Sequence, residues 1–579
     1  MDTVRFLLPF CRPYSKQYFL GILLQPLSIA SLLAIPYLTG EAVGKLEMGA
    51  AQEILTIVWW ILGCSVVRGI SLFATRYLLI TASRAVEFDL RNSLFGHLQS
   101  LDQLFFKRSH AGDLMARMAS DVDRTRLIIG PVIMYSVSTI CMLVFAIPLM
   151  LSLSWKLTVL IMLPLSLLTL IVRFIGPRVH TQMLKAQETL SKLSSHSQEN
   201  FAGVRVVKSF AQETSETERF SRSARRYADE NLKAAMYSAW MHPLIGGVGD
   251  LGQIFIILVG GILILYGQLG LPELIKFTGY LLALLWPMLS IGWVVNQYQR
   301  GAASVHRIRE LLDQKPQIAS PPEPSSAPSG KIQGHVSIRK LTFSYGRPEV
   351  LRDVSIEVPL GHTIAIVGRT GSGKSTLVSL IPRIYPVPDD TVFVDGVDIN
   401  RYPLSELRRS IGFVPQESFL FSRSISRNIA FASDELDHEK IHSIAELTRL
   451  ANDVDQFPKG YEEVVGERGV TLSGGQRQRA ALARALAIDP RILILDDALS
   501  AVDTQTEEEI LAGLRRFTEN LTTIIVSHRI SSIQHADRIY VIDEGVIIEQ
   551  GTHDELVRHD GIYAEIHRLQ LISDELENM

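Results

Sequence analysis

Long apolar stretches recur through the first 300 residues of the chain and then stop. Each has about twenty or more residues, enough for a helix to cross a hydrocarbon core of about 30 Å. Buried helices of a soluble protein are usually shorter and amphipathic, so that alternative is disfavoured. The pattern therefore predicts a membrane domain with six helical spans, at residues 18–40, 54–82, 127–152, 157–175, 240–266 and 274–295.

The loops between these spans predict how the chain is oriented. The loop after the second span and the loop after the fourth are long, rich in Lys and Arg, and free of proline at residues 82–104 and 181–240. The alternate loops are short and carry few basic residues. Because basic loops stay on the cytoplasmic side, both termini are expected there. A helix over residues 54–104 would be about 75 Å long, so the basic loops should project from the membrane as helical stalks.

A change of composition divides the chain. Residues 313–331 are dominated by proline and serine, which is typical of an extended linker. After it, short β-branched runs alternate with helical stretches, which predicts an α/β domain with a largely parallel sheet. The expected organisation is thus a membrane domain at 1–312, a linker at 313–331 and a second domain at 332–579. The expected strands are residues 335–339, 363–367, 391–394, 411–414, 492–495, 522–526 and 538–542.

Composition narrows the function. The net charge is −3, which disfavours a nucleic acid as partner, and the mean hydropathy of +0.19 fits an apolar half joined to an ordinary one. The chain has three cysteines, Cys11, Cys64 and Cys141, and their spacing shows no pairs. This pattern argues against a disulfide framework or a zinc cluster.

A phosphate-binding loop stands between an expected strand and an expected helix. The motif G-x-x-x-x-G-K-S begins at Gly368 and ends at Ser375. Glycines let the backbone approach a phosphate, Lys374 is expected to bridge the β- and γ-phosphates of ATP, and Ser375 to ligate Mg²⁺. The expected nucleotide-binding residues of the motif are Gly368, Thr370, Gly371, Ser372, Gly373, Lys374, Ser375 and Thr376.

Two further features point to the same chemistry. An apolar strand ends in Asp496, which is expected to help hold Mg²⁺, and Asp497 follows directly. The segment Ser473, Gly474, Gly475, Gln476 opens an Ala- and Leu-rich helix and forms a second anion site. One nucleotide does not need two such sites from one chain, so the second is predicted to complete a nucleotide pocket on another copy of the domain.

Together these motifs resemble ATP-binding cassette (ABC) exporter half-transporters, of the type that fuses membrane and nucleotide-binding domains, over residues 5–570. The resemblance implies that Tyr345 stacks on adenine and that Gln416 contacts Mg²⁺ and the membrane domain. It implies that Asp503 lies in the loop crossing the cassette interface and that His528 contacts the γ-phosphate. Segments 105–113 and 201–208 resemble the coupling helices, and segment 466–469 resembles the exporter segment that touches the partner's coupling helices.

One position departs from the family pattern. After the Asp496 position the family usually has glutamate, which orients the attacking water, and here the residue is Asp497. The shorter side chain falls about 1 Å short, which can slow a positioned step about 10²-fold. The resemblance is therefore to the degenerate subunit of heterodimeric exporters, whose partner supplies the glutamate. The alternative is a homodimer in which Asp497, with Gln416 and His528, is an adequate catalytic group.

The expected function is ATP-driven export of small amphipathic compounds, as in multidrug exporters, across the bacterial inner membrane. A homodimeric lipid flippase or peptide exporter is the first alternative, and a non-transporting regulator or ATP-gated channel the second. Charges inside a membrane are costly and usually face a cavity, although Arg173 and Asp250 lie near span ends and are equally explained by snorkelling. The expected cavity lining is Arg68, Arg76, Tyr266, Trp286, Trp293 and Asn296.

Overall fold

The computed structural model describes residues 2–321, 331–346, 348–433, 437–466, 469, 471–517 and 521–577. The chain forms two compact units, and each is described by itself. The first comprises Met1–Gln99 and His110–Gln314. The second comprises Lys315–Met579 together with the short segment Ser100–Ser109. In chain order this segment lies within the expected membrane domain, residues 1–312.

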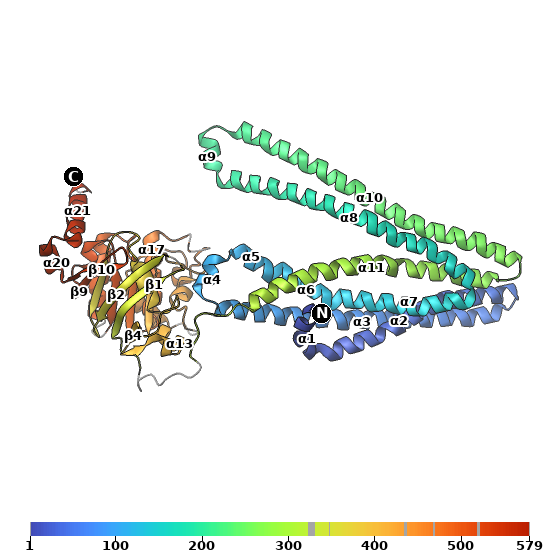
Figure 1. The fold of residues 1–579 in the computed structure, drawn as a ribbon, viewed down its shortest axis with the longest axis horizontal. Helices are drawn as coiled ribbons and strands as arrows, with labels where there is room; N and C mark the ends of the chain where they lie inside the picture. Colours follow the sequence, from blue (N-terminus) through green and yellow to red (C-terminus); the bar gives the residue numbers. More distant parts are fainter. Residues whose placement is uncertain are drawn as a thin grey trace. The chain divides into compact units, whose positions relative to one another are not determined.

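The first unit is helical throughout its described residues (Figure 1). Two five-residue π-helical segments, Arg117–Asp121 and Ile128–Val132, flank α6, and a short 3₁₀ turn, Arg12–Tyr14, joins α1 to α2. The helices are α1 (Asp2–Cys11), α2 (Ser15–Glu47), α3 (Ala51–Ser100, whose last residue belongs to the second unit), α5 (Ala111–Ala116), α6 (Val122–Leu127), α7 (Ile133–Leu153), α8 (Trp155–Ala202), α9 (Val204–Ser209), α10 (Glu213–Leu265) and α11 (Leu271–Leu312).

Five helical stretches of the described residues are long and apolar enough to cross a membrane. The remaining expected span, residues 157–175, falls in α8, where the side chains of Leu165 and of residues 167–173, Arg173 included, lie outside the described residues. The apolar stretch of α3 has only 6 % of its residues buried within the unit, against 33 % for the first stretch. Most side chains of this apolar stretch therefore face outward, as in a helix that contacts lipid or a partner, whereas Leu79, Leu90 and Leu94 farther along α3 are buried.

The helical stalks are more broken than the sequence suggests. The expected helix over 54–104 ends at Ser100, because Asp102 caps a separate helix, α4 (Gln103–Arg108), by accepting a hydrogen bond from the Phe105 N–H at 3.1 Å. The stretch 181–240 is not one helix either. Helix α8 ends before Gly203, a poor helix former, and α10 begins only after the turn that contains Ala211 in the left-handed region.

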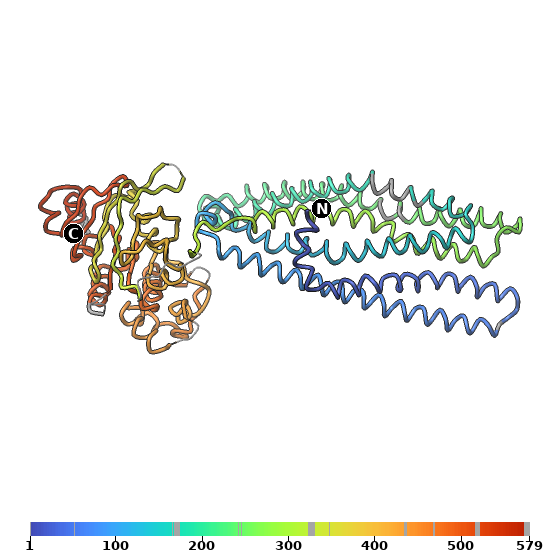
Figure 2. The backbone as a smooth tube through the Cα atoms, turned by 60° about the horizontal axis from the view of Figure 1, so that its bottom comes forward, coloured from blue at the N-terminus to red at the C-terminus, as the bar shows by residue number. Residues whose placement is uncertain are grey.

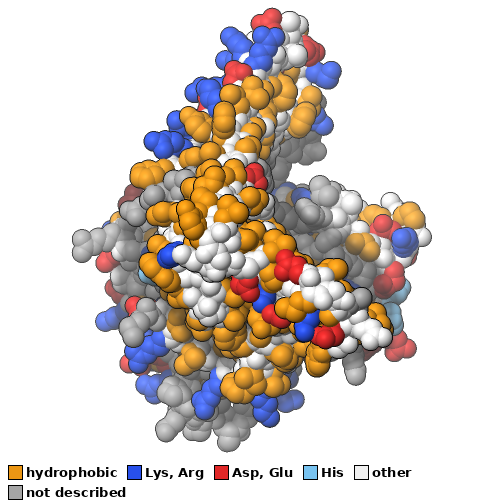
Figure 3. Space-filling model, turned by 90° about the vertical axis from the view of Figure 1, so that its right-hand side faces the viewer, with side chains coloured by type: hydrophobic (Ala, Val, Ile, Leu, Met, Phe, Trp, Pro, Cys, Tyr) orange, Lys and Arg blue, Asp and Glu red, His pale blue; other side chains and the backbone are white. Residues whose placement is uncertain are grey.

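Helices α8 and α10 run antiparallel and pack along each other, joined by α9 (Figure 1). In Figure 1 the α9 end of this pair, here called the α8–α10 arm, stands apart from the other helices of its unit, while its other end lies beside α7 and α11. In Figure 3 the arm points upward, with hydrophobic side chains along its lower part and charged side chains toward its upper end. The α9 end of the arm therefore offers a surface that the other helices of its own unit do not cover.

The second unit is built on two sheets rather than the one largely parallel sheet that the sequence predicts. A four-stranded antiparallel sheet has the order β2-β1-β4-β5, and a six-stranded sheet has the order β10-β9-β3-β8-β7-β6. The strands are β1 (Val336–Ser344), β2 (Glu349–Val358), β3 (Thr363–Val367), β4 (Val392–Val394), β5 (Val397–Asp398), β6 (Ile411–Val414), β7 (Ile492–Asp496), β8 (Thr522–Val526), β9 (Arg538–Asp543) and β10 (Val546–Gly551).

The six-stranded sheet matches the parallel prediction except at its edge, where β10 pairs antiparallel with β9. All residues of β7 and β8 are buried, as expected of central parallel strands covered on both faces. The helices of this unit are α4, α12 (Lys374–Leu380), α13 (Leu404–Arg409), α14 (Ile425–Ile429), α15 (His438–Leu447), α16 (Ala451–Val454), α17 (Gly474–Leu486), α18 (Thr504–Phe517), α19 (Ile530–Ile533), α20 (His553–His559) and α21 (Ile562–Glu577).

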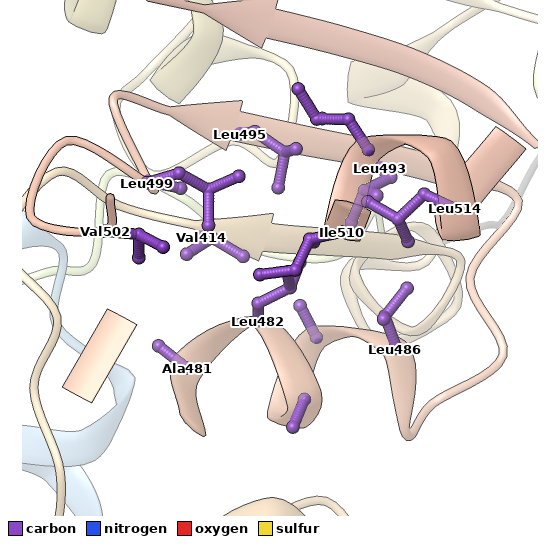
Figure 4. Close-up of a cluster of buried hydrophobic side chains, with 14 of the residues drawn as sticks. Val414, Ala481, Leu482, Leu486, Leu493, Leu495, Leu499, Val502, Ile510 and Leu514 are labelled. Atoms are coloured by element: carbon purple, nitrogen blue, oxygen red, sulfur yellow. The ribbon is translucent and has the colours of Figure 1, made fainter. Parts of the chain in front are cut away.

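The core beneath this sheet fixes the position of α17. Leu482 and Leu486 of α17 lie under Val414 of β6 and Leu493 of β7 in one buried cluster (Figure 4). Strand ends and the start of α17 are therefore held by the same packed core.

Candidate functional site

The expected nucleotide-binding residues come from one edge of the six-stranded sheet. Strands β3, β8, β7 and β6 are neighbours and parallel, so their carboxyl ends meet at this edge. The phosphate loop follows β3, Asp496 ends β7, Gln416 lies two residues after β6, and His528 lies two residues after β8.

The phosphate loop has a backbone that only glycine can follow at two places. Gly368 has φ 157°, and a Cβ atom there would lie 2.0 Å from the Ile542 carbonyl oxygen. Gly373 has φ 102°, and its Cβ would lie 2.8 Å from Leu351. Between them, Ser372 is buried and its hydroxyl has no hydrogen-bond partner among the described residues. A buried, unpartnered hydroxyl inside a glycine loop fits a ligand with several oxygen atoms, such as a phosphate chain.

Lys374 is the buried cation of this site. Its ammonium group donates hydrogen bonds to the carbonyl oxygens of Gly368, at 2.8 Å, and Arg369, at 2.9 Å. Burial lowers the pKa of Lys374, and the charges of Asp496 and Asp497 oppose that shift. The ammonium is thus held inside the loop, where a phosphate oxygen could replace either carbonyl.

Asp496 is joined to the phosphate loop by Ser375. The Ser375 hydroxyl donates to Asp496 Oδ1 at 2.9 Å, and Asp496 is only 4 % exposed. Burial raises the pKa of Asp496, the Ser375 hydrogen bond opposes this, and the neighbouring charge of Asp497 raises the pKa further. A hydroxyl beside a carboxylate is an all-oxygen donor set, which fits Mg²⁺ when ATP is bound.

Asp497 lies beside the same edge and not inside the loop. Its backbone is in the left-handed region, at φ 49°, and its N–H donates to the Val526 carbonyl oxygen at 2.8 Å. Gln416 Nε2 donates to Asp497 Oδ2 at 3.4 Å. Partial burial and the Lys374 charge lower the pKa of His528, while Asp497 opposes the shift. His528 is therefore neutral near pH 7, with one ring nitrogen able to donate a hydrogen bond and the other able to accept one.

These side chains surround a hollow of about 200 Å³. The expected residues that line it are Thr370, Gly371, Gly373, Lys374, Ser375, Thr376, Gln416, Asp496, Asp497 and His528. Tyr345 joins this group through Thr376, to which its hydroxyl donates at 3.0 Å. Ser473, Gly474, Gly475, Gln476 and Asp503 are not among the described residues around the hollow. One chain thus assembles one half of the expected ATP site.

Tyr345 also has a partner that the sequence does not reveal. Its ring packs edge to face against Tyr385, with centroids 5.0 Å apart. The Lys107 ammonium of α4 lies 5.0 Å from the Tyr345 centroid and 4.9 Å from that of Tyr385. Segment 105–113, which resembles a coupling helix, therefore begins beside the expected adenine-stacking residue.

The expected signature loop is closed by its own hydrogen bonds. Ser473 Oγ accepts from the Gln476 N–H at 3.2 Å, and the Gln476 side chain accepts from the Ser473 N–H at 2.9 Å. This reciprocal cap starts α17. The Gln476 amide also donates to Asp453 at 3.1 Å, which fixes its orientation.

Two residues that sequence reasoning did not single out contact the segment just before Asp503. Gln478 accepts from the Ala501 N–H at 2.8 Å and donates to Ser500 Oγ at 3.0 Å. Arg529, next to His528, donates to the carbonyl oxygens of Val502 at 2.8 Å and Ser500 at 3.0 Å. Both residues are polar and lie next to recognised motifs, which is the one sequence signal that could have drawn attention to them. The groups that they contact are 22 to 29 residues away in sequence, so no local pattern reveals the contacts. In the expected segment 466–469, Glu467 and Arg468 lie outside the described residues.

The membrane unit has its own hollow, of about 400 Å³. Of the expected cavity residues, Arg68, Arg76 and Trp286 line it. Trp293 packs edge to face on the lining residue Tyr135, with centroids 5.3 Å apart. The described residues that line the hollow do not include Asn296 or Tyr266. Tyr266 lies instead at the end of α10, as its C-terminal cap. Asp250 is exposed within this unit.

Comparisons with known proteins agree with this geometry. Residues 18–288 match the ABC transporter transmembrane region, and residues 351–500 match the ABC transporter family of nucleotide-binding domains. The probable multidrug resistance ABC transporter ATP-binding/permease protein YheI of Bacillus subtilis is 35 % identical, over 98 % of this chain and 97 % of its own length. The multidrug resistance-like ATP-binding protein MdlA of Escherichia coli is 33 % identical, over 97 % and 95 %.

A relative named for a different role is similarly close. The ATP-dependent lipid A-core flippase of Photobacterium profundum is 30 % identical, over 98 % of each chain. Among solved structures, a bacterial Atm1-family ABC exporter with ATP bound superposes with a TM-score of 0.80 at 27 % identity, covering 96 % of this chain and 99 % of the other. With membrane-spanning helices and an ATP-binding unit on one polypeptide, the chain belongs to the ABC transporters, as a multi-pass membrane ATPase that couples ATP hydrolysis to export.

Proposed function

We propose that this chain is one subunit of a heterodimeric exporter that moves amphipathic compounds outward across the bacterial inner membrane, with both termini and the ATP-binding unit in the cytoplasm. Similarity to two multidrug resistance-type relatives supports the substrate class. The observation that carries the heterodimer is Asp497, an aspartate at the position where the family has glutamate, in a chain whose signature loop is complete.

ATP in the proposed complex is held from two sides. Lys374 and Ser372 of this chain bind its phosphates, Ser375, Asp496 and Gln416 hold Mg²⁺, and Tyr345 stacks on adenine. The partner's signature loop closes the site. Mg²⁺, when bound, neutralises phosphate charge and favours attack by water at the γ-phosphate. Closure of both composite sites draws the ATP-binding units together, the coupling helices transmit this to the membrane helices, and hydrolysis resets them.

The two composite sites differ in rate in this proposal. Asp497 is one methylene shorter than glutamate, so at this chain's site it polarises the attacking water poorly, and His528 contacts the γ-phosphate. A misplacement of about 1 Å can cost about 10²-fold in rate. The signature loop of this chain, Ser473 to Gln476, and Asp503 complete the faster site on a partner that supplies the glutamate. The α9 end of the α8–α10 arm, which the other helices of its own unit leave uncovered, supports a two-chain assembly.

The test is ATP turnover by the purified full-length chain, alone and with its co-purified partner. The proposal expects ATP binding by the chain alone with turnover at least tenfold below that of the complex. Loss of ATP binding in the Lys374→Ala variant controls for a contaminating ATPase. Robust turnover by the isolated chain would contradict the heterodimer and favour a homodimer.

A second candidate is a homodimeric lipid flippase, favoured by the similarity to the lipid A-core flippase. It requires Asp497 to be an adequate catalytic group in two identical sites. ATP-dependent movement of a fluorescent lipid across vesicles that contain this chain alone would support it, and movement only in the presence of a second chain would exclude it.

A further inference from the structure

The hollow in the membrane unit has an unusual balance of charge. Its walls come from α2, α3, α7 and α11, and its volume of about 400 Å³ is in the range of small-molecule sites. In Figure 2, the pair α2 and α3, in dark blue, diverges from α7 and α11 toward the far end of the helices. Two arginines, Arg68 and Arg76, line the hollow, and no carboxylate is among the described residues that line it.

The two arginines lie on one face of α3. With Leu72 between them, they repeat at every fourth residue, and all three line the hollow. Their Cα atoms are about 12 Å apart along the helix axis. Arg68 lies 14 residues beyond the start of the expected span, about 21 Å into a hydrocarbon core of about 30 Å. Arg76 is near the opposite boundary of that core.

Neither arginine side chain has an ion pair or hydrogen bond with a described residue. Other basic residues of the same unit do have partners. Lys276 forms an ion pair with Glu41 at 2.6 Å, and Arg307 forms one with Asp121 at 2.5 Å. A charge within a membrane is costly and is normally matched by a partner or a water-filled cavity. The two unmatched charges in this hollow therefore call for a ligand of opposite sign.

A buried polar group completes the hollow. Gln25 is 3 % exposed, and its Oε1 atom has no hydrogen-bond partner among the described residues. On another wall, the Thr139 and Ser290 hydroxyls lie 2.9 Å apart and satisfy each other. Trp286, 66 % exposed within the single chain, adds a large apolar surface. The hollow thus joins two cations and one unsatisfied amide to apolar walls.

We propose that this hollow binds amphipathic anions, with a carboxylate, sulfonate or phosphate headgroup between Arg68 and Arg76 and the apolar part against Trp286 and the neighbouring α7 and α11 side chains. The Gln25 Oε1 atom is an acceptor, so it is left for a hydroxyl or N–H group of the ligand and takes no part in binding the anionic headgroup. The inference rests on the proposed export function and names its substrate class. An amphipathic cation of the same size is disfavoured, because it meets two like charges in a low-dielectric site.

The test compares two probes that differ only in charge. The full-length chain, in nanodiscs of phosphatidylcholine without ATP, is titrated with a dansyl-labelled dodecyl chain that ends in a sulfonate and with the same chain ending in trimethylammonium. We expect saturable binding of the sulfonate at least tenfold tighter than that of the ammonium probe. The variant with both Arg68→Gln and Arg76→Gln should lose at least tenfold in sulfonate affinity.

Three controls keep this result specific. The variant with both Arg68→Lys and Arg76→Lys keeps the charge and should retain most of the affinity, which separates charge from misfolding. Arg222→Gln, on the exposed part of α10, should bind as the unmodified chain does. Displacement of the sulfonate probe by phosphatidylglycerol would assign the site to lipid headgroups, and no displacement would assign it to soluble anions.

Equal affinity for both probes, or unchanged sulfonate affinity in the double glutamine variant, would overturn the inference. The experiments distinguish a failure of the anion-binding inference from a failure of the proposed export function. Sulfonate binding without ATP-driven transport by any complex would contradict export and leave the anion site standing, whereas ATP-driven transport of the ammonium probe alone would do the reverse.

Discussion

The phosphate loop and the signature loop each begin a helix, yet they are prepared for phosphate in opposite ways. At the start of α12 the cap residue is Gly373, which has no side chain to accept a hydrogen bond from the helix N–H groups. At the start of α17, Ser473 and Gln476 satisfy each other's backbone N–H groups. The first loop is left open around Lys374, and the second is held in shape before any ligand arrives.

The difference extends to what surrounds each loop. The phosphate loop has carboxylates nearby, Asp496 and Asp497, and its hollow includes no signature residue among the described ones. The signature loop is fixed to the segment before Asp503 by Gln478. The phosphate loop thus lies beside the ionisable side chains that could take part in a reaction, whereas the signature loop is a surface held in one shape by hydrogen bonds. The comparison teaches that a single chain carries two unlike loops, and in the proposed function each is completed by the other kind of loop from a second chain.

The largest expected effect comes from breaking the phosphate loop. Lys374→Ala removes the buried ammonium, and hydrogen bonds to charged groups contribute about 1.5–3 kcal/mol each, so ATP affinity should fall about 10²-fold or more. The measurement is titration of the full-length chain with a fluorescent ATP analogue. Lys440→Met, which removes a surface lysine paired with Asp489, serves as the matched control and should bind normally. Unchanged affinity in Lys374→Ala would contradict the assignment of this loop.

Breaking the signature loop should separate binding from turnover. A Cβ at Gly475 would lie 2.9 Å from the Ala501 carbonyl oxygen, so Gly475→Asp adds both a clash and a negative charge. We expect turnover by the two-chain complex to fall about 10²-fold, because the partner's site loses its closing surface. ATP binding by this chain should not change. Gly96→Asp, at an exposed position of α3 where a Cβ meets nothing within 4 Å, is the control.

Changing Asp497 should sharpen the contrast between the two composite sites. Asp497→Glu restores the missing methylene, so turnover at this chain's own site should rise at least tenfold. Asp497→Asn removes the carboxylate and should change turnover of the complex less than twofold, since the partner's site does most of the work. Single-turnover hydrolysis by the complex measures both. A tenfold loss in Asp497→Asn would show that Asp497 already carries catalysis.

The smallest effect concerns pH. The folded pKa of His528 lies below its ordinary value of 6.5, so below pH 6.5 the unfolded chain binds this proton more readily than the folded one. Its contribution to the free energy of unfolding is therefore full above pH 6.5 and is lost as pH falls toward the folded pKa. His528→Gln should flatten that part of the stability profile, measured by thermal unfolding between pH 5 and 8. An identical slope in both proteins would contradict the shift.

Much of the second unit could be predicted from the sequence because its central strands are short buried runs bounded by turn residues. Strands β3, β6 and β8 begin and end where the pattern predicts. Strand β2 was missed because it alternates buried and exposed residues over 349–358 and pairs with β1 in an antiparallel sheet. The helix breaks after Ser100 and before Gly203 were also missed, since helical composition continues through both.

The residues of the candidate ATP site could be predicted where they belong to contiguous sequence motifs. They could not be predicted where their role depends on contacts between segments far apart in sequence. The hollow around Lys374 collects residues from four strand ends because their motifs follow those strands directly. The Lys107–Tyr345 contact and the Gln478–Ala501 hydrogen bond join segments far apart in sequence, so no local pattern reveals them. The pairing of Lys276 with Glu41, and the absence of a partner for Arg68 among the described residues, likewise emerge only from packing.

The central claim is that this chain's signature loop closes the ATP site of a different protein. Thr471, exposed and two residues before Ser473, can carry a cysteine in a chain whose Cys11, Cys64 and Cys141 are replaced by serine. A short thiol-to-amine crosslinker is applied to native membranes with and without ATP, and the joined peptides are identified by mass spectrometry. The account predicts an ATP-dependent link to the phosphate loop of a second chain that has glutamate at the Asp497 position. A link to this chain's own Gly368–Thr376 sequence in another copy would contradict it.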